Sequence, residues 1–257
     1  DGCDSGSPGW RKNLRDNTIT GVTPIPDTDE EVNEGCDGVD LNRNYQFEWG
    51  LLIGVSPVPG VCTFGDPDLV QTYPGPLDTV DNDGDGRINE DHVDGVDDDG
   101  DGLIDEDWIG GNSEPETKFI QDLTEMNDDN GDGASDFKAT LSWHSYSELV
   151  LWPWGHCNDC QTVDDEYLVY HGFVMGEMTD YEPMQSSDLY PTQGDFCDWH
   201  YGVHQSYCYT IEIGNTFHEQ PDDIAHIAVR NLGIPFYMVE IADDPRFRAV
   251  HGIENMS

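Results

Sequence analysis

The sequence has 257 residues, 36% of them hydrophobic and 11% aromatic, which is an ordinary composition for a globular domain with a real core. Its 10 Lys and Arg stand against 54 Asp and Glu, and the formal net charge of -44 would repel nucleic-acid phosphates and anionic membrane surfaces. No apolar run of about 18 residues is present, so we expect no membrane span. The chain opens at Asp1-Gly2, without a Met or an apolar leader.

Seven cysteines indicate an oxidising compartment, so we expect a secreted or extracellular protein. Cys36 and Cys62 flank an Asn-Arg-Asn segment and could close that loop with a disulfide. The segment Cys157–Cys160 is a single C-x-x-C, for which a local disulfide is favoured over a metal or redox motif because no second pair accompanies it. The odd count leaves one thiol over, or paired with something outside this sequence.

An acidic repeat comes next along the chain. The segment Asp81–Asp91 recurs as Asp97–Asp107 with Gly and Ile in register, and a looser copy begins at Asp128. The D-x-D-x-D-G spacing places oxygen ligands on one side of a turn, which suits Ca²⁺, although the twelfth position of an EF-hand is His92 or Trp108 instead of Glu. A disordered acidic loop is the alternative. The candidate calcium ligands are Asp81, Asp83, Asp85, Asp97, Asp99, Asp101, Asp128, Asn130 and Asp132.

Three later segments have the apolar spacing of helices. Ser113-Glu114-Pro115-Glu116 is a capping-box start, and the apolar side chains that follow it are expected to share one face. The other two segments have an acidic first turn, which favours a helix N-terminus. The apolar residues of the first helix are Phe119, Ile120, Leu123 and Met126, and the later helices are expected over 164–179 and 222–232.

Two segments have the alternation of strands. Residues 137–154 predict a strand that bends near His144, and residues 206–213, rich in Tyr, Ile and Thr, predict another. Strands that alternate with helices of this length predict an α/β fold with a mixed β-sheet sandwiched by helices. The acidic calcium-binding-type repeats then form an insertion over 77–111.

Five short blocks stand in a distinctive order. They are Trp10-Arg11-Lys12-Asn13, Gly38–Asn44, Ser142–Tyr146, Tyr190 with Asp198-Trp199, and Tyr209–Glu212. Together they resemble the zinc metallocarboxypeptidases of the carboxypeptidase A/T type, which hydrolyse the last peptide bond of a chain. The resemblance covers 1–245, and 246–257 would be a C-terminal extension or the start of a following segment. It implies Zn²⁺ as cofactor, beside structural Ca²⁺ in the repeats, and peptide or protein C-termini as substrate.

The resemblance also implies which groups react. His144 is expected to be a zinc ligand at the end of the central strand, and Glu212 the general base that takes a proton from a zinc-bound water. Arg11 resembles the group that stabilises the tetrahedral oxyanion. Without this context, a lone His after a strand is commonly structural, a strand Glu is commonly solvated, and an Arg in so acidic a chain commonly joins a surface ion pair.

A substrate site follows from the same resemblance. Asn42 and Arg43 resemble the pair that grips the terminal carboxylate, since a guanidinium matches a carboxylate bidentately. Tyr190 resembles the mobile phenol that closes over the bound end. Cys197 stands at the floor of the specificity pocket, where relatives carry Asp or Ile, and Asp195 could supply a charge for Lys or Arg, so we expect a mixed preference. Ser145 and Tyr146 complete the set.

The implied zinc site is not complete in this sequence. The family takes two of its three ligands from a His-x-x-Glu motif upstream of the Trp10 block, whereas Asp1-Gly2 resembles the end of a turn that follows it. A His-x-x-Glu occurs at His251 and Glu254, but only a circular permutation would bring it to His144. We expect that an N-terminal portion is missing and that the chain alone is inactive or nearly so.

Two other functions stay open on the sequence alone. A non-catalytic peptide-binding relative would keep the carboxylate clamp without the metal, although it would have no need of Glu212 or Arg11. A calcium-ordered extracellular structural segment would keep the acidic repeats and treat the carboxypeptidase blocks as relics. Release of C-terminal residues from peptides separates both of them from the enzyme.

Overall fold

The computed structural model describes residues 40–47 and 114–256. The chain divides into two compact units, residues 1–121 and 122–257. Arg11, Cys36, Cys62 and the 77–111 insertion lie outside the described residues. None of the helices in the described ranges is long and apolar enough to cross a membrane.

The described part of the first unit contains a short 3₁₀ helix, η1 (Leu41–Arg43), and the first turns of helix α1 (Pro115–Glu125). Asp40 caps η1, because its Oδ1 accepts a hydrogen bond of 3.0 Å from the amide of Asn42. The side-chain oxygen of Asn44 accepts a 3.1 Å bond from the amide of Glu114. This bond joins the η1 segment to the residue that precedes α1.

Helix α1 begins at Pro115, where the capping sequence predicts a start, and most of the apolar residues that the spacing places on one face are exposed. Its buried side chains are polar. Helical spacing shows which residues share a face and cannot show which face packs. The buried residues are Thr117, Gln121 and Thr124, and the exposed apolar ones are Phe119, Leu123 and Met126.

Four strands in the second unit form one mixed sheet in the order β1-β4-β2-β3, which confirms the predicted fold class. β1 pairs with β4 in parallel, β4 with β2 antiparallel, and β2 with β3 in parallel. The strand expected over 137–154 is in fact two strands on opposite sides of β4, because the chain reverses after His144. The strands are β1 (Ala139–His144), β2 (Leu149–Trp152), β3 (Glu182–Gln185) and β4 (Tyr207–Glu212).

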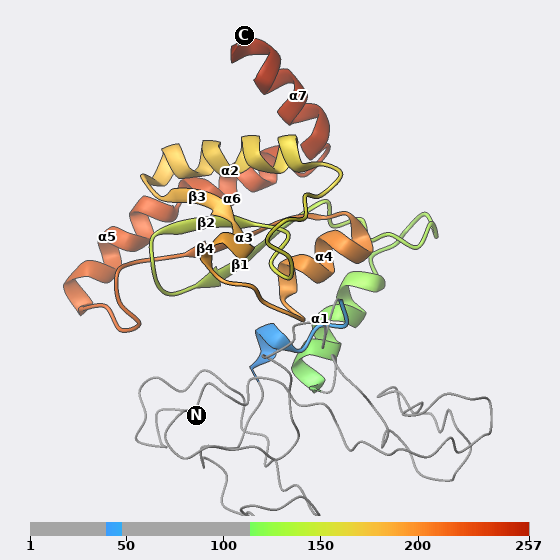
Figure 1. Ribbon diagram of the computed structural model, residues 1–257, viewed down its shortest axis with the longest axis horizontal. Helices are drawn as coiled ribbons and strands as arrows, with labels where there is room; N and C mark the ends of the chain where they lie inside the picture. Colours follow the sequence, from blue (N-terminus) through green and yellow to red (C-terminus); the bar gives the residue numbers. More distant parts are fainter. Residues whose placement is uncertain (1–39, 48–113, 257) are drawn as a thin grey trace, which may run out of the picture. The chain divides into compact units, whose positions relative to one another are not determined.

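One face of the sheet packs against helices α2 (Asp165–Thr179) and α6 (Gly233–Ile241). Tyr209 and Ile211 of β4 are fully buried there, and the Tyr209 hydroxyl donates a 2.9 Å hydrogen bond to the carbonyl of Leu168 in α2. Figure 1 shows α2 running alongside β3 and β2. Burial of large side chains on this face supplies the main apolar contribution to the stability of the second unit.

Side chains alternate across a strand, so Cys208, Thr210 and Glu212 of β4 project to the opposite face. Helix α4 (Phe196–His204) lies there, contacts β4 and β1, and is joined to β4 by the Cys197–Cys208 disulfide. The short helix α3 (Ser186–Leu189) precedes α4 in the chain. This second face therefore carries Glu212, which the sequence singled out as a candidate general base.

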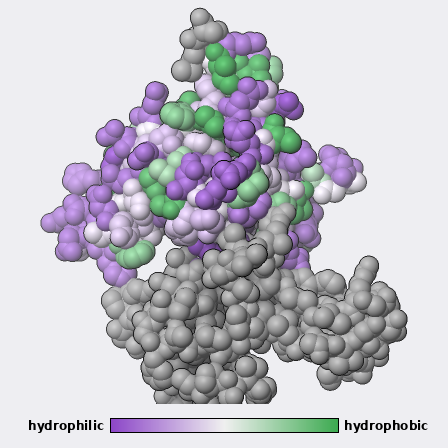
Figure 2. All heavy atoms as spheres, in the orientation of Figure 1, coloured by the Kyte–Doolittle hydropathy of each residue, from purple (hydrophilic) through white to green (hydrophobic). Residues whose placement is uncertain are grey.

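The remaining helices are α5 (Pro221–Asn231) and α7 (Pro245–Met256). α5 and α2 confirm the helices predicted over 222–232 and 164–179. α7 packs against α2, where Ala249 is fully buried and the carbonyl of Pro245 lies 2.8 Å from Nε2 of His171. Most of the described surface in Figure 2 is hydrophilic, with separate apolar patches, as the acidic composition leads one to expect.

Two buried histidines fix α4 to the segment before β1. His200 Nδ1 lies 3.0 Å from the Phe196 carbonyl and its Nε2 lies 3.3 Å from Thr124 Oγ1, so the ring is held neutral with Nδ1 as donor. His204 Nδ1 accepts a 3.1 Å bond from the amide of Ser135. Burial lowers the pKa of His200 to about 4 and, with the charge of Lys138, also lowers the pKa of His204.

We expect this packing to make the fold sensitive to acid. An unfolded histidine has a pKa near 6.5, whereas folded His200, only 2% exposed, titrates at about 4, so between these values the unfolded state binds more protons. The contribution of neutral His200 to the stability of the fold is complete above pH 6.5 and is lost as the pH falls towards 4. Urea unfolding at pH 7 and 4.5 should show that the wild type loses roughly 2 to 3 kcal/mol more than His200→Gln.

The matched control is His226→Gln, because His226 is exposed on α5. It should follow the wild type at both pH values. Equal losses in the wild type and His200→Gln would show that His200 does not carry the acid sensitivity.

Candidate active site

The carboxyl ends of β1 and β4 bring His144 and Glu212 together. The two strands are parallel, and their register places His144 directly opposite Glu212 as the last pair of the ladder. Both side chains are half-buried. Because both residues end their strands, they lie at one edge of the sheet and on the face that also carries α4. The sequence predicted both residues as functional, and the structure makes them neighbours.

Backbone bonds continue beyond this pair and hold the loops that follow the strands. The amide of Ile213 donates to the His144 carbonyl at 2.9 Å, and the amide of Ser147 donates to the Gly214 carbonyl at 3.1 Å. Ser145 and Tyr146 are exposed in the first of these loops, and the Tyr146 ring packs edge-on against Phe217 with centroids 4.7 Å apart. Both candidate substrate residues therefore lie directly beyond the His144 and Glu212 pair.

His144 is a suitable metal donor, but the described residues do not make a complete zinc site. Its Nε2 lies 3.0 Å from Ser142 Oγ, two residues earlier on the same strand. Among the residues that the structure describes, no group of three His, Cys, Asp or Glu side chains could hold a metal ion. His251 and Glu254 lie on α7, which packs against α2, and they form no such group with His144 within the described part of the chain.

The two candidate carboxylate-clamp residues belong to the first unit. Asn42 and Arg43 lie in η1, and the Arg43 guanidinium donates through Nη1 to the Asn42 carbonyl at 2.8 Å. Arg43 is only 5% exposed. The backbone of both residues is thus fixed by Asp40 at the start of η1.

The segment that holds Tyr190 runs from α3 into α4. Tyr190 ends α3 with extended backbone and is 48% exposed. Asp195 caps α4 by accepting the Asp198 amide at 2.9 Å, and it also accepts the Thr192 hydroxyl at 2.5 Å. Cys197 is buried in its disulfide with Cys208, and its sulfur accepts the hydroxyl of Thr210 at 3.5 Å.

A family model described as zinc carboxypeptidase matches residues 1–232, which is most of the chain and includes both members of the His144 and Glu212 pair. The chain belongs to the zinc carboxypeptidase family. Known members share parts of its sequence. A zinc carboxypeptidase of Saccharothrix mutabilis subsp. capreolus is 38% identical over 86 residues, 32% of this chain and 20% of that relative. Carboxypeptidase B of Astacus astacus is 27% identical over 196 residues, 71% of this chain and 46% of that relative.

A solved structure is also similar. Bovine thrombin-activatable fibrinolysis inhibitor, in complex with tick carboxypeptidase inhibitor, matches with a TM-score of 0.53 and 21% identity, covering 96% of this chain and 62% of that one. At this identity the likeness supports the fold alone. This carboxypeptidase-family chain spans less than half the length of the curated relatives it matches.

The looser acidic copy in this family member forms a tight loop. Asp128 accepts the amides of Gly131, Asp132 and Gly133 at 2.8 to 3.1 Å, and these bonds, that of Gly133 foremost, lower the pKa of its carboxyl. Asn130 likewise accepts the Asp132 amide at 2.8 Å. The structure gives no support for calcium here, which stays a prediction, and the two fuller repeats lie outside the described residues.

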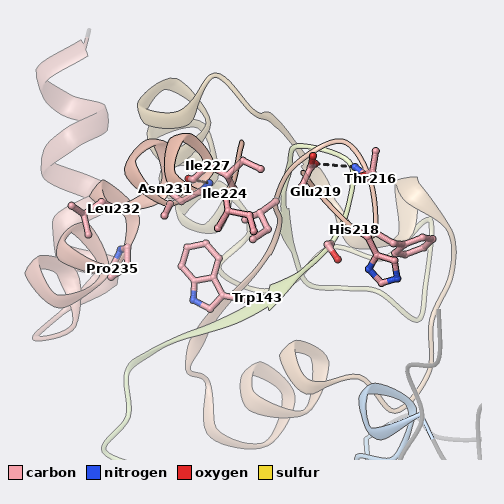
Figure 3. Close-up of a pocket in the computed structure, with 13 residues that line it drawn as sticks. Trp143, Thr216, His218, Glu219, Ile224, Ile227, Asn231, Leu232 and Pro235 are labelled. Carbon is pink, nitrogen blue, oxygen red and sulfur yellow. Dashed lines mark hydrogen bonds between the residues drawn. The ribbon is translucent and has the colours of Figure 1, made fainter. Parts of the chain in front are cut away.

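An apolar pocket of ≈ 640 Å³ lies on the other face of the sheet. Trp143 precedes His144 and so projects away from it, and Figure 3 shows its indole lying across from Ile224 and Ile227 of α5. Glu219 holds the rim through bonds from the amides of Asn215 and Thr216. The sequence did not point to this pocket, because its walls come from three separate segments.

Sequence reasoning also missed two polar residues that bind the backbone near α3 and α4. The sequence marked Asp198 only as a member of one of the five blocks. In the structure its side chain is 1% exposed and accepts hydrogen bonds from the amides of Gly155 and His156. Gln185, at the end of β3, belongs to no sequence motif that would have marked it as important. The Cys157–Cys160 disulfide was predicted and is confirmed, whereas the pairing of Cys197 with Cys208 was not foreseen.

The turn after Glu212 is held by a close contact that a stability measurement can test. Gly214 has φ +71°, and a Cβ there would lie 2.4 Å from Glu219 Oε1. We expect Gly214→Ala to lower the free energy of unfolding by roughly 2 to 3 kcal/mol, since it adds left-handed strain and pushes the Glu219 carboxylate off the two amides that it binds. Gly131→Ala is the matched control: it has the same φ of +71° with nothing within 4 Å, and should lose only about 1 kcal/mol.

Urea unfolding of the two variants provides the measurement. Adding Glu219→Ala to Gly214→Ala should cost less than the sum of the two single changes, because the clash disappears. Equal losses for Gly214→Ala and Gly131→Ala would mean that Glu219 does not hold this turn.

Proposed function

We propose that this protein is a zinc-dependent carboxypeptidase that hydrolyses the last peptide bond of peptides or proteins. The observation that carries the proposal is the pairing of His144 with Glu212 at the ends of two parallel strands, in a chain of the zinc carboxypeptidase family. His144 is a candidate zinc ligand, and the further ligands have to come from outside the described residues. The disulfides favour an extracellular setting.

Glu212 is proposed as the general base. Its carboxylate takes a proton from the attacking water as the water oxygen bonds to the scissile carbonyl carbon. When the carbon–nitrogen bond breaks, the same proton passes to the departing amine, so Glu212 ends the cycle ionised. A half-buried position at a strand end suits this role, since the backbone that carries the carboxylate is held by the sheet.

Recognition of the chain end is assigned to Asn42 and Arg43, with Tyr190 closing over it and Arg11 stabilising the oxyanion. A guanidinium that binds the terminal carboxylate bidentately would reject internal peptide bonds. Ser145 and Tyr146 are proposed to contact the residues before the scissile bond. The Cys197–Cys208 disulfide gives the pocket floor no charge, and Asp195 is engaged as a helix cap, so a preference for apolar ends fits these contacts better than one for basic ends.

We expect Glu212→Gln to abolish turnover of a peptide panel in the full-length protein while substrate binding is largely retained. Glutamine keeps the size of the side chain and cannot accept the proton, so kcat should fall by at least about 100-fold. Release of free amino acids and calorimetric binding of an uncleaved peptide are the two measurements.

Glu182→Gln is the matched control, because Glu182 is an exposed strand glutamate on β3 with no assigned role. It should hydrolyse peptides like the wild type. Turnover that survives in Glu212→Gln removes the assignment of the base. A wild type that binds peptide ends but never cleaves them would favour the non-catalytic peptide-binding relative.

Calcium is proposed as a structural ion of the acidic repeats. An ion that binds the folded state alone raises the melting temperature with concentration. We therefore expect added Ca²⁺ to raise the melting temperature of the full-length protein, and Mg²⁺ at equal ionic strength to raise it less. A melting temperature that does not respond to Ca²⁺ would remove the calcium role.

A further inference from the structure

Two adjacent backbone carbonyls hold both ends of the segment that carries Tyr190. The carbonyl of Trp154 accepts a 3.2 Å hydrogen bond from the Ser187 amide, and the carbonyl of Gly155 accepts a 2.9 Å bond from the Thr192 amide. Tyr190 lies between these two anchors and is 48% exposed. The position of the phenol therefore depends on how the peptide units at 154 and 155 are held.

The amide side of the same stretch is held by α4. Asp198, only 1% exposed, accepts the amides of Gly155 at 2.8 Å and His156 at 2.9 Å. Its Oδ2 also lies 2.8 Å from Nδ1 of His156. Hydrogen bonds to a buried carboxylate are among the strong ones in proteins, so Asp198 fixes the orientation of both peptide units.

The Gln185 side chain links the backbone at Trp154 to the loop between Cys157 and Cys160. Its Nε2 lies 3.0 Å from the carbonyl oxygen of Cys157 and 3.2 Å from that of Cys160. The same nitrogen lies 3.0 Å from the Trp154 oxygen and 2.7 Å from Ser187 Oγ. The Gln185 amide group has only two hydrogens to donate. It can therefore be shared among these acceptors only because the loop brings its carbonyl oxygens close together around Nε2. The Cys157–Cys160 disulfide closes this loop.

The segment that carries Tyr190 packs closely against the backbone of residues 154–156. A Cβ at Gly155 would lie 2.3 Å from Thr192 Oγ1 and 2.6 Å from Asp195 Oδ2. Only glycine permits so close an approach. A shift of the 154–156 backbone would consequently be transmitted to residues on both sides of Tyr190.

We propose that Gln185 and the Cys157–Cys160 loop are a positioning element for Tyr190. They hold residues 186–192 against the backbone of 154–156, so that the phenol returns to one place when a peptide end is bound. The role of Tyr190 in this statement rests on the proposed function, whereas the anchoring does not. Loss of either half of the element should loosen the Tyr190 segment and leave β4, which carries Glu212, undisturbed.

Hydrogen exchange of the full chain tests the anchoring without any assay of activity. In Gln185→Met, which keeps the side-chain length and removes the donors, peptides that contain the Ser187 and Thr192 amides should exchange at least about tenfold faster than in the wild type. The double variant Cys157→Ser, Cys160→Ser should do the same. Exchange in β4 should not change, and Asn158→Ser, an exposed change inside the same loop, is the control and should match the wild type.

Unchanged exchange over 186–192 in Gln185→Met would overturn the proposal. If the double serine variant also loses protection in β4, it has failed to fold, and Gln185→Met decides alone. A general loss of stability would increase exchange everywhere, so the restriction to 186–192 separates positioning from a merely structural role.

Kinetics of an active preparation show whether the element acts through Tyr190. Gln185→Met should lower kcat/KM for peptides several-fold in the wild-type background and have no further effect in Tyr190→Ala. Equal effects in both backgrounds would contradict positioning of Tyr190. If exchange rises but the wild type hydrolyses no peptide, the anchoring stands and the proposed function fails. If the wild type hydrolyses peptides while exchange is unchanged, the positioning inference alone fails.

Discussion

Parallel pairing of β1 with β4 is the constraint on which the candidate active site depends. Parallel strands end at the same edge of a sheet, and here the register makes His144 and Glu212 the last matched pair. Since successive side chains point to opposite faces, a slip of one residue would turn one of the two away from the other. Tyr209 and Ile211, fully buried on the far face of β4, hold this register by packing. The proposed chemistry on one face thus depends on the apolar core on the other.

The difference between the two faces of the sheet also explains which elements surround the candidate site. α2 and α6 cover the core face, while α4 lies on the face with His144 and Glu212 and is joined to β4 by Cys197–Cys208. Asp198 at the start of α4 then fixes the 154–156 backbone, on which the Tyr190 segment rests. A chain of contacts therefore runs from the central strand to the residue proposed to close over the substrate.

Much of this architecture could be predicted from the sequence, because strong periodicity reports local structure. α2, α5 and β4 lie within a residue or two of the expected ranges. The break between β1 and β2 could not be seen, since alternation continues through the loop at Ser145 and Tyr146. The face of α1 that packs could not be predicted either, because helical spacing does not show which face has a partner.

The site was predictable only in part, for a related physical reason. His144 and Glu212 lie in short blocks whose residue order carries information, so they could be named in advance. Gln185, Gly155 and Asp198 act through contacts between residues far apart in the chain, and no local pattern marks such contacts. The partner of Cys197 was equally hidden, because a helix-to-strand disulfide depends on how α4 packs on β4.

The most direct test of the central claim is zinc-edge anomalous diffraction from crystals of the full-length protein grown with zinc. The account predicts a zinc peak about 2.0 to 2.1 Å from a ring nitrogen of His144, with the Glu212 carboxylate one water away from the metal. Zinc bound without His144, or a Glu212 side chain turned to the opposite face of the sheet, would contradict it.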